Sequence, residues 1–247
     1  MRRRNLLVLL ASGFIAACDR IGQSEAFASL ANGAQGWHRG LHKALSFGRI
    51  AMAPEFARSE ISPEFRANGN ATVDDAAWQA LQAGGFADWR LAVTGLVDTP
   101  LALSLAQLQA LPQRTQVTRH DCVEGWSAIA EWTGPQLAQV LALTGVQSQA
   151  RFVVFHCADA LRQGAYYESC DMEDARHPQT ILAHAMNGEP LPEKNGAPLR
   201  LRIERQLGYK HAKYLTGIEL VASLDAIGEG KGGYWEDHNG YQWYAGI

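Results

Sequence analysis

The stretch RHDCVEGWS, residues 119–127, places one cysteine, Cys122, between a basic segment and a glycine–aromatic turn. The sequence before it, residues 113–120, has the pattern of a strand, and we expect a loop after it. A thiol at a strand end can point into a cavity, and loops on a rigid scaffold often carry binding and catalytic groups. A thiolate is both a nucleophile and a soft metal ligand, but free cysteine is also among the most buried residue types. Alone, the stretch leaves a reactive and an inert thiol both open.

The composition indicates a folded, slightly acidic protein. The chain has 247 residues, 47% hydrophobic and 19% charged, with a formal net charge of -3. This length suits one large domain or two small ones, and this composition favours a packed core over disorder. Without the three arginines of residues 2–4, 19 basic residues face 25 acidic ones, a net charge of -6. We therefore expect no binding to nucleic acid.

The cysteine spacing excludes the simplest metal and redox motifs. The four cysteines are Cys18, Cys122, Cys157 and Cys170. No C-x-x-C pair occurs, so neither a structural zinc site nor a thioredoxin-like motif is predicted. Cys157 and Cys170 could form a disulfide in an oxidising compartment, or remain two buried thiols. His38 and His42 could share a helical face, but without an H-E-x-x-H pattern packed or solvent-facing histidines are favoured.

Residues 1–17 have the pattern of an export signal. Arginines at positions 2–4 precede an apolar run, residues 6–17, that is too short to span a bilayer. RRNLL, residues 3–7, resembles a twin-arginine signal, and IAAC, residues 15–18, resembles a lipobox. We expect a periplasmic protein, with attachment to the inner membrane if Cys18 is lipidated and a plain leader cut near Ala17 as the alternative. Residues 18–60 are then a tether or lead-in, and residues 61–247 the main domain.

After the leader, short strands alternate with short helices. We expect helices at 74–81 with Thr72 or Asp74 as cap, at 105–111 after Ser104, and at 136–143, opened by residues 132–135. The expected strands are 89–97, 113–120, 151–156, 166–169, 199–204 and 218–221. Asn187-Gly188 is a strong hairpin signal, and residues 228–247 are rich in glycine and aromatic residues. The pattern favours an α+β fold of mostly mixed sheets, because βαβ alternation and a G-x-G-x-x-G turn are both missing.

Three features together indicate a metal held by one sulfur and a phosphate-bearing ligand. Cys122 lies at a strand end, Asn-Gly turns at 68–69 and 195–196 expose N–H groups suited to anions, and basic residues gather late in the chain. These are Arg200, Arg202, Arg205, Lys210 and Lys213. Arg and Lys both bind phosphate, although each could equally belong to a solvated face.

Two other classes of function stay open at this point. A cysteine hydrolase could use His120 or a later histidine, because such triads are spatial and sequence alone cannot identify them. A binding lipoprotein without turnover is the second alternative. A serine hydrolase is disfavoured because no G-x-S-x-G motif occurs.

Several motifs in order resemble the sulfite oxidase/MsrP-like molybdopterin-dependent oxidoreductases. They are HDCVEGWS at 120–127 with W-x-G at 132–134, HPQT at 177–180, MNG at 186–188, LP at 191–192, NGAPLRL at 195–201 and GYKHAK at 208–213. The similarity runs from about residue 62 to 233. It implies the α+β molybdopterin-binding fold of that family and two-electron, oxygen-atom-transfer chemistry on a small substrate such as sulfite or a sulfoxide.

The resemblance also implies roles for individual residues. Molybdenum would be held by the pterin dithiolene and by the thiolate of Cys122. The positions that match cofactor-binding segments are Asn68, Asn195, Arg200, His211, Ala212 and Lys213. Cys157 stands near the cofactor, where relatives tend to have Ser or Thr. Arg119 and His120, together with Arg162, are candidate substrate-side groups.

The resemblance further implies how electrons reach the site. No haem-attachment C-x-x-C-H occurs, so we expect a separate electron-transfer protein, a haem protein or a membrane cytochrome. The chain also stops without the immunoglobulin-like dimerisation domain of classical sulfite oxidases, as in the smaller bacterial members. We also expect a monomer.

Overall fold

The computed structural model describes residues 40–41 and 51–247. The chain divides into a unit at residues 1–50 and a second at 51–247, which we call the body and describe by itself. The predicted export signal, the lipobox with Cys18, the His38/His42 pair and most of the predicted lead-in lie outside the described residues. Among the described helices, none combines the length and the apolar character needed to cross a membrane.

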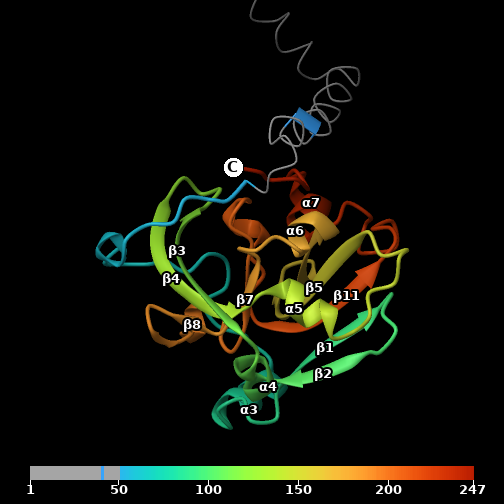
Figure 1. Cartoon of the computed structure of the whole chain (residues 1–247), viewed down its shortest axis with the longest axis horizontal. Coiled ribbons are helices and arrows are strands. Elements are labelled where there is room, and N and C mark those ends of the chain that lie inside the picture. Colours follow the sequence, from blue (N-terminus) through green and yellow to red (C-terminus); the bar gives the residue numbers. More distant parts are fainter. Residues whose placement is uncertain (1–39, 42–50) are drawn as a thin grey trace, which may run out of the picture. The chain divides into compact units, whose positions relative to one another are not determined.

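The larger sheet of the body has the strand order β2-β1-β11-β5-β6 (Figure 1). Its strands are β1 (Arg90–Gly95), β2 (Leu101–Ser104), β5 (Phe152–Leu161), β6 (Gly164–Asp171) and β11 (Leu215–Val221). β1 pairs with β11 in parallel, and the other neighbours are antiparallel. Successive side chains of a strand point to opposite faces, so β1 buries Leu91 and Val93 and exposes Arg90. The alternation predicted at 89–97 is confirmed.

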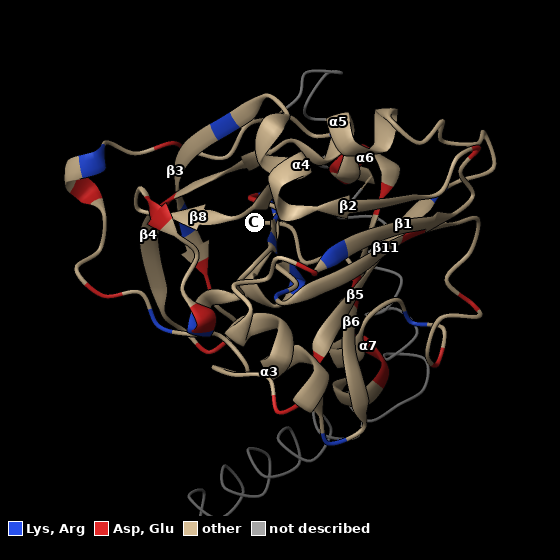
Figure 2. Cartoon of the chain, turned by 90° about the horizontal axis from the view of Figure 1, so that it is seen from below, with Lys and Arg blue, Asp and Glu red and all other residues tan. Residues whose placement is uncertain are grey.

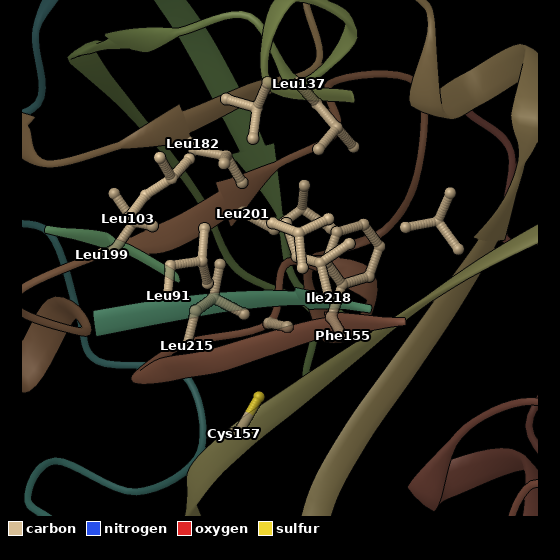
Figure 3. Close-up of a cluster of buried hydrophobic side chains, with 14 of the residues drawn as sticks. Leu91, Leu103, Leu137, Phe155, Cys157, Leu182, Leu199, Leu201, Leu215 and Ile218 are labelled. Carbon is tan, nitrogen blue, oxygen red and sulfur yellow. The ribbon is translucent and has the colours of Figure 1, made fainter. Parts of the chain in front are cut away.

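The hydrophobic core lies where this sheet meets α5 (Leu137–Ala142), β7 (Ile181–Ala183) and β10 (Arg200–Arg202) (Figure 3). Leu91 and Leu215 of the sheet belong to the same buried cluster as Leu137, Leu182 and Leu201. Each of these five leucines is at most 1% exposed. Burial of one such side chain contributes roughly 1.5–3 kcal/mol, so the cluster fixes the strands that carry the site.

Cys157 and Cys170 are free thiols buried in this core. The β5–β6 register pairs Cys170 with Val153, and Cys157 lies four residues further along β5. At about 3.3 Å per residue, that offset exceeds the span of a disulfide. The disulfide alternative is therefore wrong, and the two cysteines are unpaired buried thiols.

The second sheet, with the order β3-β4-β8-β9, carries Cys122. Its strands are β3 (Gln113–Asp121), β4 (Ser127–Pro135), β8 (Ala185–Met186) and β9 (Glu189–Pro190). β3 and β4 pair over their whole length, which confirms the strand at 113–120 and turns the loop expected after Cys122 into a hairpin turn. Residues 132–135 do not open a helix. They end β4, and α5 follows directly with Gln136 as its N-cap. Gly134 packs so closely that an added Cβ would lie 2.0 Å from the carbonyl oxygen of Leu182.

The helices are short, and α5 packs into the core. They are α3 (Ala76–Ala83), α4 (Leu105–Ala110), α5, α6 (Met172–Ala175), α7 (Tyr234–Asn239) and the 3-10 turns η1 (Arg58–Glu60), η2 (Glu193–Asn195) and η3 (Gly208–Lys210). The pattern predicted α3, α4 and α5 but neither α6 nor α7, and α7 lies in the aromatic-rich tail. The mixture of sheets with few short helices confirms the α+β class.

Helix α3 has a different N-cap from either predicted one. The carboxylate of Asp75 accepts a hydrogen bond from the N–H of Trp78 at 2.8 Å. Because this bond satisfies an otherwise unpaired helical N–H, we expect Asp75→Ala to lower the free energy of unfolding by about 1 kcal/mol. The matched control is Asp74→Ala, which removes the exposed neighbouring carboxylate but no cap. Urea denaturation of both variants measures the difference, and equal losses would contradict the cap assignment.

Candidate functional site

A cavity opens beside the hairpin turn that carries Cys122. It holds about 660 Å³ of empty space, its open mouth included. Segments far apart in the sequence meet around it: residues 68–70, the hairpin turn, β5, β6, η3 and the C-terminal tail. The lining residues are Asn68, Gly69, Asn70, Cys122, Val123, Glu124, Asp159, Leu161, Tyr166, Tyr209, Lys213, Trp235 and Tyr241.

Cys122 is the first residue after β3 and is 9% exposed. Its N–H donates to the carbonyl oxygen of Trp126 at 2.9 Å, and its own carbonyl accepts from the N–H of Gly125 at 3.0 Å. Gly125 has φ 84°, a conformation that glycine adopts without strain. Burial raises the pKa of the Cys122 thiol, and the nearby charge of Glu124 raises it further. A thiol of raised pKa is a weak nucleophile, whereas a bound metal ion would deprotonate it.

Two buried cations, Lys213 and Arg200, accompany the thiol. Figure 2 shows most charged segments on the outer strands and loops, with some Lys and Arg segments among the central strands of the body. Lys213 lines the cavity and donates to the carbonyl oxygens of Asn70 and Lys194. Burial and then the charge of Arg200 lower the pKa of Lys213 to about 7. Burial and then Arg202 lower the pKa of Arg200 to about 9. Buried cations destabilised in this way favour an anionic ligand.

Several buried polar atoms around these cations lack a hydrogen-bond partner within the described residues. They are Asn68 Oδ1, Asn195 Nδ2, Arg200 Nε and His211 Nδ1. Each unsatisfied buried group costs about 1–3 kcal/mol. Asn68 lines the cavity, and the other three residues are buried in the wall behind it. A ligand that combines many polar groups with a phosphate would satisfy such atoms, so the donors, the cations and the single thiol fit a molybdopterin cofactor.

Gly196 lets the segment after η2 approach Lys213 closely. Gly196 follows η2 and has φ 108°, and an added Cβ there would lie 2.9 Å from Cβ of Lys213. Nη1 of Arg200 donates to the carbonyl oxygen of Asn195 at 3.0 Å, and its Nη2 donates to that of His211 at 3.2 Å. The NGAPLRL and GYKHAK motifs are therefore held against each other by Arg200.

His120 lies in a buried hydrogen-bonded network at the root of the hairpin turn. Its Nδ1 accepts from Nη1 of Arg202 at 2.9 Å, and Arg202 binds both oxygens of Glu204, at 2.9 and 2.6 Å. Burial and then Arg202 lower the pKa of His120 well below its usual value. His120 is therefore a neutral residue that braces β3 through Arg202, and its Nδ1 is not free to act as a base for Cys122.

Arg119 points the other way, because alternate residues of β3 face opposite sides. Its side chain is 55% exposed and pairs with Asp121 at 2.9 Å. It lines a separate groove with Glu204 and Ile247. No contact in the described part of the chain places Arg119 at the Cys122 cavity, so its predicted substrate-side role has no structural support.

The structure thus brings only part of the predicted set together on one surface. Cys122, Asn68 and Lys213 line the cavity. Five other predicted cofactor residues are buried and do not line it: Cys157, Asn195, Arg200, His211 and Ala212. Their roles toward a cofactor remain predictions. Within the described residues, no group of three or more His, Cys, Asp or Glu side chains is arranged to hold a metal ion.

Sequence analysis missed the aromatic and acidic part of the wall. Asn70 and Asp159 hydrogen-bond to each other at 3.0 Å beside Lys213, and nothing in the local pattern marks Asp159. Trp235 and Tyr241 come from the tail whose aromatic content was noted without a role. That enrichment was the available signal, because aromatic residues in a glycine-rich segment need a surface to pack on.

Comparison with known proteins agrees with this site. Residues 79–225 match the family described as oxidoreductase molybdopterin binding domain. The chain is 40% identical over 215 residues to a protein of Azospira oryzae named as a candidate protein-methionine-sulfoxide reductase subunit, YedZ1, covering 87% of this chain and 72% of that protein. It is 35% identical over 147 residues to the protein-methionine-sulfoxide reductase catalytic subunit MsrP of Xanthomonas campestris, covering 55% of this chain and 46% of MsrP.

A solved structure supports the fold. The sulfane dehydrogenase SoxCD from Paracoccus pantotrophus matches with a TM-score of 0.51 and 24% identity, over 55% of this chain and 39% of that one. The fold and the site thus define a molybdopterin-binding oxidoreductase. The chain belongs to the sulfite oxidase/MsrP-like family of molybdopterin-dependent oxidoreductases. It spans about half the length of the MsrP relatives it matches.

Proposed function

We propose that this chain binds a molybdenum cofactor at the Cys122 cavity and reduces a sulfoxide, with protein-bound methionine sulfoxide as the substrate class. One observation carries the proposal: a cavity lined by a single thiol also holds a buried, destabilised cation, Lys213. The names of the MsrP relatives supply the substrate class. In the balanced reaction, the sulfoxide takes up two electrons and two protons and yields a thioether and water.

Each residue type would bind a different part of the cofactor. Cys122 would hold the metal, Asn68 and Asn195 would bind polar groups of the pterin, and Lys213 would meet the phosphate with Arg200 behind it. Bound there, the cofactor supplies the two-electron oxygen-atom chemistry. The protein binds the substrate and excludes water.

An aromatic wall suits a methionine-derived substrate. Trp235 and Tyr241 stack with their ring centroids 5.7 Å apart, and Tyr209 meets Tyr241 edge-on at 5.0 Å. Aromatic rings make favourable contacts with the sulfur of a thioether. Among the described residues that line the cavity, Lys213 is the only cation, so a neutral sulfoxide fits the cavity better than sulfite.

The proposal also includes the surroundings of the enzyme. A separate electron-transfer protein, a haem protein or membrane cytochrome, would supply the two electrons to a monomer. Export by the twin-arginine-like signal of residues 1–17 would deliver the folded, cofactor-loaded protein to the periplasm. A lipidated Cys18, followed by the lead-in of residues 18–60, would hold the domain of residues 61–247 at the inner membrane.

The test is a paired measurement of cofactor and turnover. Protein from a molybdenum-replete host is analysed for molybdenum and released pterin, then assayed for methionine sulfoxide reduction with a reduced viologen and for sulfite oxidation with ferricyanide. We expect about one molybdenum and one pterin per chain and turnover of the sulfoxide. Sulfite oxidation alone would overturn the substrate class. Folded protein from that host with neither metal nor pterin would favour the binding-protein alternative.

A further inference from the structure

A buried ion cluster lies directly behind the aromatic wall of the cavity. Nζ of Lys210 lies 2.5 Å from Oε2 of Glu168 and 2.6 Å from Oε1 of Glu236. All three side chains are at most 1% exposed. Lys210 belongs to η3, Glu168 to β6 and Glu236 to α7, so one ammonium group joins three elements that are distant in the sequence.

Each member of the cluster lies within two residues of an aromatic residue of the cavity. Tyr209 precedes Lys210, Trp235 precedes Glu236, and Tyr166 lies two residues before Glu168 on β6. The Tyr166 hydroxyl donates to the carbonyl oxygen of Tyr209 at 2.6 Å, which joins two of these segments a second time. Any displacement of β6, η3 or α7 relative to one another would therefore move the wall that faces the substrate.

The cluster contains one cation and two carboxyl groups. A fully ionised cluster would bury a net charge of -1, which is costly in the protein interior. Oε1 of Glu168 and Oε2 of Glu236 have no partner among the described residues, and two carboxylates cannot donate to each other. Gly233 lies so close to both that an added Cβ would be 2.2 Å from Oε2 of Glu236 and 2.6 Å from Oε2 of Glu168. A single proton shared by the two carboxyl groups removes the excess charge.

The surrounding titratable groups leave the Glu168 carboxyl as the group that changes charge. The cluster acts on Tyr166 and Cys170 of β6, on Cys157 of β5 and on Tyr209 of η3, and burial raises the pKa of each. These groups therefore stay neutral near neutral pH. Burial lowers the pKa of Lys210, but the two carboxylates outweigh burial and raise it, so Lys210 stays charged. The pKa of Glu168 lies well above its usual value. Burial is the largest cause, Lys210 acts against it, and the neighbouring Glu236 adds to it.

We propose that Lys210, Glu168 and Glu236 are positioning residues that hold the aromatic wall against the substrate while the two carboxyl groups share one proton. The proposal rests on the proposed function for its substrate. Its direction with pH follows from the buried Glu168 carboxyl, which faces Glu236 across Lys210. A carboxyl group whose pKa is raised on folding contributes stability below its ordinary pKa, and that contribution is lost as the pH rises through the folded-state pKa. The wall is therefore held at low pH and released at high pH.

The first experiment uses Glu236→Gln, which keeps the shape of the side chain and removes the shared proton. In the holoenzyme, we expect the KM of the unaltered protein for a methionine sulfoxide peptide to rise about tenfold with increasing pH, over the range in which the holoenzyme stays folded, through the loss of one well-packed aromatic contact. The KM of Glu236→Gln should not change over the same range, and its molybdenum content should equal that of the unaltered protein. Glu229→Gln, an exposed carboxylate of the same tail, is the matched control and should follow the unaltered protein.

The second experiment needs no turnover. Acrylamide quenching of Trp235 fluorescence, taken as the difference from Trp235→Phe in the same background, should increase with pH in the unaltered holoenzyme and stay constant in Glu236→Gln. If no sulfoxide is reduced, the proposed function fails while this result still tests the cluster. Identical pH responses in both proteins, or none in either, would overturn the positioning role, as would loss of molybdenum from Glu236→Gln. If that variant does not fold, Glu168→Gln removes the same titration and carries the same test.

Discussion

Replacing Cys122 by alanine is expected to lower kcat/KM for sulfoxide reduction by at least about 10³-fold, equivalent to about 4 kcal/mol of transition-state stabilisation. The thiol is the only cysteine sulfur among the described residues that lines the cavity. Because a thiolate binds soft metals far better than a methyl group or a hydroxyl, the variant should lose molybdenum or change its coordination. Metal analysis and the visible absorption spectrum, together with the rate, measure both effects.

The matched control for this prediction is Cys170→Ala. Cys170 is a free thiol that is 1% exposed in the core and does not line the cavity. This substitution should cost stability but retain the molybdenum stoichiometry and spectrum. Full activity and unaltered metal coordination in Cys122→Ser would remove Cys122 from the site. Loss of activity on thiol alkylation of a metal-free but active protein would instead revive the cysteine hydrolase.

The local sequence pattern predicted the position of Cys122 at a strand end but not the other residues that line the cavity. The strand ending before Cys122 was predictable because its alternation and its turn lie within fifteen residues. So was α4, whose cap Ser104 accepts from the N–H of Gln107 at 3.2 Å. The cavity that Cys122 lines is also lined by Tyr166, Trp235 and Tyr241. The packing of β6 and the tail brings these residues there, and no local sequence pattern predicts it.

Arg119 and His120 show that near neighbours in a strand can lie in different surroundings. Both are predicted substrate-side groups, three and two residues before Cys122. In a strand, neighbours point to opposite faces, so Arg119 went to solvent and His120 into the network with Arg202. Of the predicted cofactor residues, Asn68 and Lys213 line the cavity with Cys122, while the roles of the five buried ones stay predictions.

Lys213→Met is expected to weaken cofactor binding while stabilising the cofactor-free protein. Loss of one charge-assisted hydrogen bond to phosphate should reduce cofactor affinity about 10- to 100-fold. Without cofactor, the charged Lys213 ammonium destabilises the folded protein, because burial lowers its pKa from 10.5 to about 7. Between pH 7 and 10.5, the unfolded chain therefore binds more protons than the folded one. The loss of unfolding free energy caused by the buried charge is complete below pH 7 and disappears as the pH rises through this window.

The stability arm of this prediction has a defined size and sign. At pH 6, cofactor-free Lys213→Met should exceed the unaltered protein in free energy of unfolding by about 1–3 kcal/mol, after allowance for its lost bonds to two carbonyl oxygens. The difference should shrink toward zero near pH 10. Lys231→Met, at a side chain 58% exposed, is the matched control and should show neither effect. Denaturation of protein from a host without pterin synthesis measures the change in stability. Cofactor retention on dilution measures the change in cofactor affinity. A cofactor-free variant that is less stable than the unaltered protein at pH 6 would contradict this prediction. It would mean that the hydrogen bonds of Lys213 to its two carbonyl partners outweigh the cost of burying its charge.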